Sequence, residues 1–181
     1  MTERALELAR RLGNARTEMV LTANLGEMLR FEGDLGRATE LYVEALRLVR
    51  GEARHSILFD LGQAAVEQND PDGAEKRYRE AHAVSGTGEE RLWWAYDILS
   101  MGQVAALRSQ HERATRLLGA AAAAMEKFGE KINPLDQRVL DPLLAACREA
   151  LDDAAFETAW SAGRALPIEQ SLADAFDGTA T

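Results

Sequence analysis

Apolar residues recur along most of the chain at the three-to-four-residue spacing of one face of a helix. The pattern predicts a helical pair between His55 and Val84 and further helices at about 2–13, 15–31, 35–50, 89–108, 112–128, 134–151, 152–163 and 167–177. No segment alternates apolar and polar residues with a period of two, so we expect no β-sheet. The sequence therefore predicts an all-α protein.

Two of the predicted turns carry residues that end one helix and start the next. Gly33 can adopt the left-handed conformation that ends a helix, and Asp34 can accept a hydrogen bond from the free amides of the following one. In the second turn Asn69 can cap, and Asp70 and Pro71 can start the next helix. Both turns predict tight antiparallel helical hairpins.

The predicted hairpins repeat in sequence. Seven residues recur 36 positions later: Leu25-Gly26, Asp34, Ala38, Tyr42, Glu44 and Ala45 return as Leu61-Gly62, Asp70, Ala74, Tyr78, Glu80 and Ala81. A weaker third copy follows 40 residues further on, as Met101-Gly102, Ala114, Leu118 and Ala121. Helical hairpins repeated in this way stack into a solenoid with a concave surface that usually holds another molecule.

Each copy combines a glycine in its first helix with an alanine and a larger residue in its second: Gly26, Ala38 and Tyr42; Gly62, Ala74 and Tyr78; Gly102, Ala114 and Leu118. A glycine inside a helix costs about 1 kcal/mol, so close packing of the paired helices must return at least that much. We expect the alanines to face the glycines, and the larger residues to fill the groove between hairpins.

Composition narrows the class of protein. A chain of 181 residues that is 46% hydrophobic can bury the core of one domain or a short array. Cys147 is the only cysteine, which favours a reducing compartment, and we predict the cytoplasm. We find neither a secretion signal nor an apolar run long enough to span a membrane. A net charge of −9 argues against autonomous nucleic-acid binding.

The repeated positions resemble those of the tetratricopeptide repeat, which has a small residue at its eighth position, alanine at the twentieth and twenty-seventh, and an aromatic residue at the twenty-fourth. The resemblance covers about residues 19–125. The usual proline at the thirty-second position is replaced by Arg50, Gly86 and Glu126. We predict a tetratricopeptide-like helix-pair solenoid, divided into a partial repeat helix and link (1–18), three repeats (19–130) and a C-terminal helical cap (131–181).

The C-terminal segments ERATRLLGAAAAAMEKFG, LLAACREAL, FETAW and SAGRALPIEQSLADAF look like the end of bacterial LuxR-type regulators and related signal-transduction ATPases of the maltose-activator kind. This resemblance implies a sensor or interaction region that receives a protein segment or small-molecule inducer and relays its binding to upstream domains. It carries over no activity, because the chain lacks both a GxxxxGK[ST] phosphate loop and a basic helix-turn-helix. We expect neither an enzyme nor a bound cofactor.

In repeats of this kind, the first helix of each pair lines the concave face. The repeat frame places on it Asn24, Glu27, Arg30, Phe31, Phe59, Asp60, Gln63, Glu67, Tyr96, Ser100, Gln103 and Leu107. We predict that they form a mixed polar and aromatic groove that binds the partner or inducer. The alternative is that they are ordinary solvent-facing residues.

Other candidate sites have structural explanations. His55, His82 and His111 lack the spacing of metal ligands, so we expect surface or capping roles and no metal site. The carboxylate pairs Glu89-Glu90 and Asp152-Asp153 lie at helix starts, where the helix dipole stabilises them. Neither group predicts catalysis.

Aromatic residues suggest a core and a contact surface. Phe156 and Trp160 are expected to form the hydrophobic centre of the cap. Trp93 and Trp94 are adjacent, so one should be buried and the other partly exposed. A second hypothesis for function is self-association, a homodimer formed through this tryptophan region and the open edge of helix 2–13. That helix resembles the second helix of a repeat without its first, so the chain is either a piece of a longer protein or begins with a cap.

Overall fold

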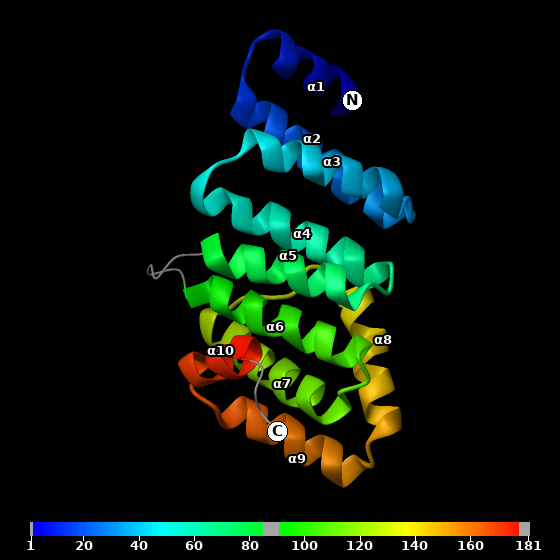
Figure 1. Cartoon of the computed structure of the whole chain (residues 1–181), viewed down its shortest axis with the longest axis vertical. Coiled ribbons are helices and arrows are strands. Elements are labelled where there is room, and N and C mark those ends of the chain that lie inside the picture. Colours follow the sequence, from blue (N-terminus) through cyan, green and yellow to red (C-terminus); the bar gives the residue numbers. More distant parts are fainter. Residues whose placement is uncertain (1, 85–90, 178–181) are drawn as a thin grey trace.

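The computed structural model describes residues 2–84 and 91–177 (Figure 1). These residues form ten α-helices and one 3₁₀ turn, and none of them lies in a β-strand. The helices are α1 (Thr2–Arg11), α2 (Ala15–Glu32), α3 (Leu35–Leu48), α4 (Arg54–Glu67), α5 (Pro71–Val84), α6 (Arg91–Leu107), α7 (His111–Phe128), α8 (Pro134–Ala150), α9 (Asp153–Ala165) and α10 (Ile168–Asp177), with the 3₁₀ turn at Gly51–Ala53. Each lies close to a predicted helix. Glu89 and Glu90, predicted to begin one of them, lie outside the described residues.

The helices stack as antiparallel pairs along the long axis of the molecule (Figure 1). α2 packs on α3, α4 on α5 and α6 on α7, and smaller contacts of α3 with α4 and of α5 with α6 join successive pairs. This arrangement confirms the predicted all-α helix-pair solenoid.

The turns within the first two pairs have the predicted chemistry. Gly33 ends α2 at a φ of 87°, and the side chain of Asp34 accepts a hydrogen bond from the amide of Arg37 at 3.2 Å. Asn69 has a φ of 56°, and Asp70 accepts a hydrogen bond from the amide of Gly73 at 2.9 Å. The side-chain caps satisfy amides that open α3 and α5 and have no partner within their own helix.

The recurring glycines share one packing environment. A Cβ atom built on Gly62 would lie 2.1 Å from Cε1 of Tyr78, and one on Gly26 would lie 2.9 Å from Cε1 of Tyr42. In the third pair, a Cβ atom on Gly102 would meet Leu118 at 2.8 Å. The larger residue of each repeat therefore covers the glycine of its own hairpin. The matching alanines, Ala38, Ala74 and Ala114, are fully buried.

The last three helices depart from the repeat pattern. α8 runs almost along the long axis, whereas the repeat helices lie across it (Figure 1). α9 packs on α7 so closely that Cβ atoms on Gly119 and Gly163 would meet backbone oxygens at 2.5 and 1.9 Å. α10 returns to α6, and the rings of Phe156 and Trp160 stack at 6.1 Å inside this region. The helical cap thus contains the predicted aromatic centre.

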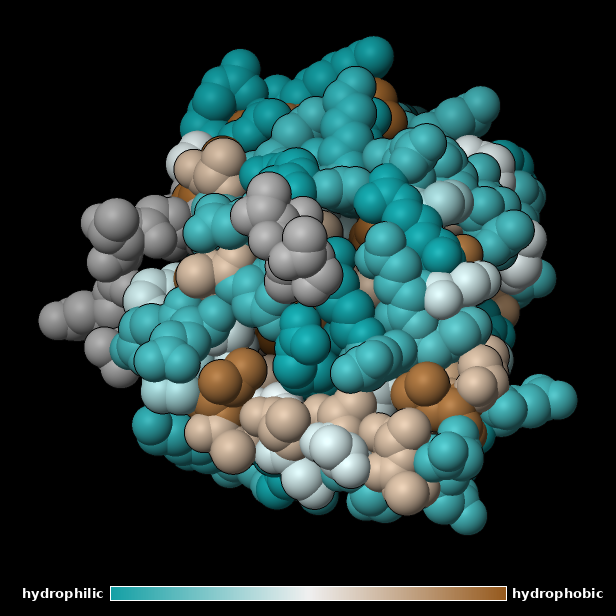
Figure 2. All heavy atoms as spheres, turned by 60° about the horizontal axis from the view of Figure 1, so that its bottom comes forward, coloured by the Kyte–Doolittle hydropathy of each residue, from teal (hydrophilic) through white to brown (hydrophobic). Residues whose placement is uncertain are grey.

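The two ends of the stack differ in their exposed side chains. α1 packs on α2 through Ala9, which is buried, but leaves Leu8 and Leu12 exposed. At the other end, Figure 2 shows a surface that is mostly hydrophilic with one band of apolar residues across its lower part. At the N-terminal end, α2 thus covers only part of the apolar surface of α1, and Leu8 and Leu12 stay exposed.

Candidate functional site

The first helices of the three pairs, α2, α4 and α6, carry the predicted concave-face residues. In α2, Asn24, Glu27 and Phe31 are exposed, and Phe31 is 65% exposed. The equivalent residues of α4 and α6 are partly or fully buried: Asp60, Gln63, Glu67, Ser100, Gln103 and Leu107. The concave face is therefore open at its N-terminal end and covered towards its C-terminal end.

The covering element is α8 together with the preceding residues 129–133. α8 packs against α4, α6 and α7, and Leu140 and Ile132 join the main hydrophobic core. Periodicity predicted α8 as an amphipathic helix, but it could not show which surface receives its apolar stripe. The chain thus fills part of its own concave face.

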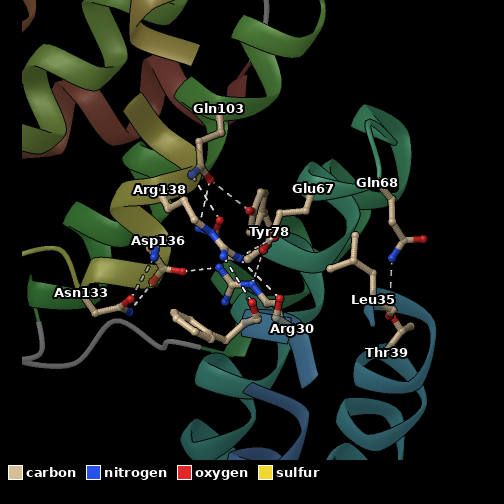
Figure 3. Close-up of polar contacts among 12 residues, drawn as sticks. Arg30, Leu35, Thr39, Glu67, Gln68, Tyr78, Gln103, Asn133, Asp136 and Arg138 are labelled. Atoms are coloured by element: carbon tan, nitrogen blue, oxygen red, sulfur yellow. Dashed lines mark hydrogen bonds and ion pairs between the residues drawn. The ribbon is translucent and has the colours of Figure 1, made fainter. Parts of the chain in front are cut away.

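Buried ion pairs hold the start of α8 in place (Figure 3). The guanidinium of Arg30, 1% exposed, bonds Asp136 of α8 at 2.5 Å and also bonds Glu67 of α4. Asn133 accepts a hydrogen bond from the amide of Asp136 at 2.9 Å and caps α8. Because Arg30 lies inside this network, its side chain serves packing of three helices, and a variant of it would test stability rather than recognition.

Arg138, two residues after Asp136 on α8, contacts the end of α2. Its guanidinium donates to the backbone oxygen of Phe31 at 3.3 Å and lies 5.3 Å from the centre of the Phe31 ring. It also lies 3.5 Å from Glu67. Beside these residues a pocket of about 320 Å³ opens between the α2–α3 turn, α4 and α8, with Leu35, Val66 and Val139 in its wall.

A second polar network lies deeper, between α4 and α6. The side-chain amides of Gln63 and Gln103 exchange two hydrogen bonds at 3.1 and 3.3 Å. The hydroxyl of Tyr78 donates to the oxygen of Gln103 at 3.1 Å (Figure 3). Both glutamines are fully buried, so they stabilise the stacking of repeats two and three and do not contact solvent.

Repeat one has no glutamine at the equivalent position, so it cannot form the same amide pair. Glu27 stands where Gln63 and Gln103 stand in the later repeats, and it is exposed. The hydroxyl of Tyr42 is buried and has no hydrogen-bond partner among the described residues. Burial raises the pKa of Asp60 to about 8, with Asp136 and Glu27 acting in the same direction and Arg30 opposing them. Glu27 of repeat one and Asp60 of repeat two therefore place two acidic side chains where the later repeats have the Gln63–Gln103 amide pair.

Aromatic residues line the middle of the face. Phe59 is buried and meets Tyr96 edge-on at 5.4 Å and Tyr78 at 6.0 Å. Ser100 donates to the backbone oxygen of Tyr96 at 2.7 Å. Burial, with the nearby carboxylates of Glu130 and Asp136, raises the pKa of Tyr96. These aromatic side chains belong mainly to the core, since the segment before α8 lies close to them.

Two exposed apolar residues on α2 were missed in the sequence. Val20 and Met28 are 43% and 50% exposed, and they lie one turn before and after Asn24 on the same helix face. Each lies four residues from Asn24, and this spacing could have placed both on the face of Asn24 from the sequence alone. Together with Phe31 they give the open end of the concave face an apolar character.

The histidines are placed differently from the prediction. His55 is fully buried and its Nε2 lies 3.0 Å from Oδ1 of Asp97, while Nδ1 of His82 lies 2.8 Å from Oδ2. The expectation of a surface or capping role was therefore wrong for His55. Asp97 instead joins α4, α5 and α6 at one buried point.

The tryptophans are both partly buried, so the expected division into one core and one exposed residue is not found. The Trp93 ring lies 4.3 Å from that of His55 and 6.0 Å from that of Tyr96. Trp93 thus extends the aromatic cluster of the concave face.

The described residues offer little for catalysis. None of them form a group of three histidine, cysteine, aspartate or glutamate side chains suited to a metal ion. Cys147 is buried, and burial raises the pKa of its thiol, which disfavours the reactive thiolate. No helix in the described ranges is both long enough and apolar enough to cross a bilayer.

Comparison with known proteins agrees with this fold. Residues 17–85, which include most of α2 and all of α3 to α5, match the family model of the tetratricopeptide repeat. No curated protein and no solved structure matches the chain. Repeats of this family form a non-catalytic fold that generally mediates protein–protein interaction. Residues 17–85 are therefore similar to tetratricopeptide repeats, and the helix pairs in this part of the chain stack as a helix-pair solenoid.

Proposed function

We propose that this chain is a non-catalytic binding module that captures a protein segment on the open end of its concave face. The observation that carries the proposal is the exposure of Phe31 and Met28 on α2, where the equivalent side chains of the later repeats are covered. Exposed apolar residues gathered on one concave surface favour a partner over solvent. The other end of the face is covered by α8 and the residues before it, whose Leu140 and Ile132 pack into the core.

Peptide selection tests this proposal directly. A random displayed peptide library is selected on the immobilised full chain, and bound peptides are titrated against wild type and the double variant Met28→Ala, Phe31→Ala. We expect at least a tenfold loss of affinity in the variant, corresponding to about 1.4 kcal/mol. The matched control is Leu8→Ala with Leu12→Ala, which removes exposed apolar side chains at the C-terminal end of α1. Equal loss in both variants, or none in the first, contradicts the proposal.

The resemblance of the C-terminal segments suggests the cellular setting. We propose that the module is the sensor or interaction part of a cytoplasmic bacterial signalling or transcriptional regulator of LuxR type. Binding of a protein segment or small-molecule inducer would then be relayed to upstream domains. In hydrogen exchange of the full-length regulator, inducer binding should protect α2 around Asn24 and Glu27. Protection confined to α9 and α10 would contradict this assignment of the inducer site.

Self-association is the second candidate function. It is favoured by Leu8 of α1 and Leu12 just after this helix, which are 54% and 72% exposed and lie one helical turn apart. Two copies could bury these side chains against each other. Light scattering over a dilution series should show a dimer that Leu8→Glu with Leu12→Glu abolishes. A monomer at every concentration excludes this function.

A further inference from the structure

We propose that the corner formed by Glu27 and Asp60 receives a lysine or arginine side chain of the captured segment. The inference rests on the proposed function, because it assigns a partner chemistry to the same open surface. We call these two residues the acidic corner. Its residue Glu27 lies one helical turn before Phe31 on α2, so one bound segment can reach both.

The internal comparison of repeats is the first support. In repeats two and three the polar residues at this level satisfy one another, through the Gln63–Gln103 amide pair and the hydroxyl of Tyr78. In repeat one the hydroxyl of Tyr42 is equally buried but has no hydrogen-bond partner within residues 2–84 and 91–177. A buried hydroxyl without a partner costs free energy. The Tyr42 hydroxyl therefore lacks the kind of hydrogen-bonding group that Gln103 supplies to Tyr78.

The charges around Asp60 indicate that the group bound there is a cation. Glu27 and Arg30 on α2 and Asp136 on α8 act electrostatically on Asp60. Glu67 and Arg138, 3.5 Å apart, belong to the same cluster. The guanidinium of Arg30 is bonded to Asp136 and Glu67, so it acts on Asp60 only through space. No hydrogen bond or ion pair holds the Asp60 carboxyl in the described part of the chain. The carboxyl groups of Glu27, Asp60, Glu67 and Asp136 outnumber the guanidinium groups of Arg30 and Arg138. The cluster therefore keeps a net negative charge even when Asp60 is protonated, and this charge favours the arrival of a further cation.

The neighbouring surface favours a side chain of a polypeptide over a free ion. The described residues hold no group of three ligands for a metal. Phe31 and Met28 provide apolar contact for a second residue of the same segment, and a long basic side chain can lay its methylene groups on such a surface. The corner then takes the charged end of that side chain in a charge-assisted hydrogen bond.

Binding should release a proton. Because the raised pKa of about 8 keeps Asp60 protonated at neutral pH, pairing with a cation requires the carboxyl to ionise. The ionised carboxylate is also an acceptor suited to the buried hydroxyl of Tyr42, whose pKa is raised by its own burial and by Asp60. Affinity should therefore increase between about pH 6 and pH 8 as the proton is more readily lost.

The decisive experiment is a double-mutant cycle between peptide and protein. Peptides selected on the wild-type chain are remade with each lysine or arginine changed to glutamine, and both forms are titrated against wild type, Asp60→Asn and Glu27→Gln. We expect about a tenfold effect of the peptide change on wild type and little effect on either variant. The matched control is Glu40→Gln, an exposed acidic residue on α3, which should behave as wild type.

The outcomes separate the inference from the proposed function. If no selected peptide depends on Phe31, the proposed function fails. If peptides depend on Phe31 but contain no basic residue, or if that residue contributes equally in Asp60→Asn, only the acidic corner is overturned.

Two further measurements use the same proteins. Calorimetry at pH 7 in two buffers of different ionisation enthalpy should show release of nearly one proton on peptide binding to wild type and none with Asp60→Asn. Agmatine alone, titrated over the same range, should bind far more weakly than the peptides. If agmatine binds as tightly as the peptides, the acidic corner binds a free cation, and the proposal that it receives a side chain of a captured segment is wrong.

Discussion

Arg30 and Asp136 form a buried ion pair across 106 residues of sequence, and the pair joins the first helix of repeat one to the first turn of α8. Neither side chain is more than 3% exposed. Asp136→Ala leaves the guanidinium of Arg30 with Glu67 alone in a buried position. We expect a loss of about 3–5 kcal/mol in unfolding free energy, measured by urea denaturation. The exposed acid Glu126, changed to glutamine, should leave the denaturation midpoint almost unchanged, and an equal shift in both would contradict the assignment.

The glycine of repeat two provides a test of helix packing. Gly62→Ala places a methyl group against the ring of Tyr78, which is held by its own hydrogen bond to Gln103. We expect a loss of about 1–3 kcal/mol on thermal or chemical unfolding. Gly36→Ala is the matched control, because its Cβ atom would meet nothing closer than 4.0 Å and alanine favours the helix. Gly36→Ala should leave the unfolding free energy unchanged or raise it slightly. A larger loss in Gly36→Ala than in Gly62→Ala would contradict the close packing of Tyr78 on Gly62.

Stability should depend on pH through Asp60. Because the pKa of Asp60 is raised to about 8 by burial, the folded chain binds a proton that the unfolded chain has already lost. The contribution of this group is fully present below about pH 4, the ordinary pKa of an aspartate, and is lost as the pH rises towards 8. Its contribution to the slope is about −1.4 kcal/mol per pH unit within that window. Denaturation from pH 5 to 8 should show that Asp60→Asn has the flatter profile; parallel profiles would exclude the raised pKa.

Asp97 should be essential for holding three helices together. Asp97→Ala removes the acceptor for both His55 and His82, and His55 has no access to water as a substitute. We expect a loss of about 3 kcal/mol in unfolding free energy, since hydrogen bonds to a buried charged group are among the stronger ones. His82→Ala should cost less, because that ring is only partly buried. A larger effect of His82→Ala than of Asp97→Ala would contradict this account.

The sequence predicted the features that depend on neighbouring residues. The turn at Gly33 and Asp34 and the close helix packing at the recurring glycines were foreseen because capping and repeat spacing are local signals. The residue that covers each glycine was predicted wrongly: we expected the alanine of the hairpin, and the structure places its larger residue there. The all-α solenoid followed from those signals together. The family match covers these residues in its two repeats.

The covering of the concave face could not be predicted in the same way. Nothing in the residues around Asp136 identifies a partner 106 positions earlier, and an amphipathic stripe does not specify the surface it will meet. As a result Gln63 and Gln103, predicted to line a groove, are buried in a structural network. His55 was misplaced for a related reason, since its acceptor Asp97 comes from the next repeat.

The path of α8 has a mechanical consequence. In a stack where each helix pair contacts only its neighbours, small rotations between the pairs change the curvature of the whole stack. α8 ties α4 to α6 and α7, and its first turn reaches α2 through Arg30. These contacts restrict such rotations on the inner side of the stack. A polypeptide that docks there as proposed would meet a surface of preset curvature and lose less entropy on binding.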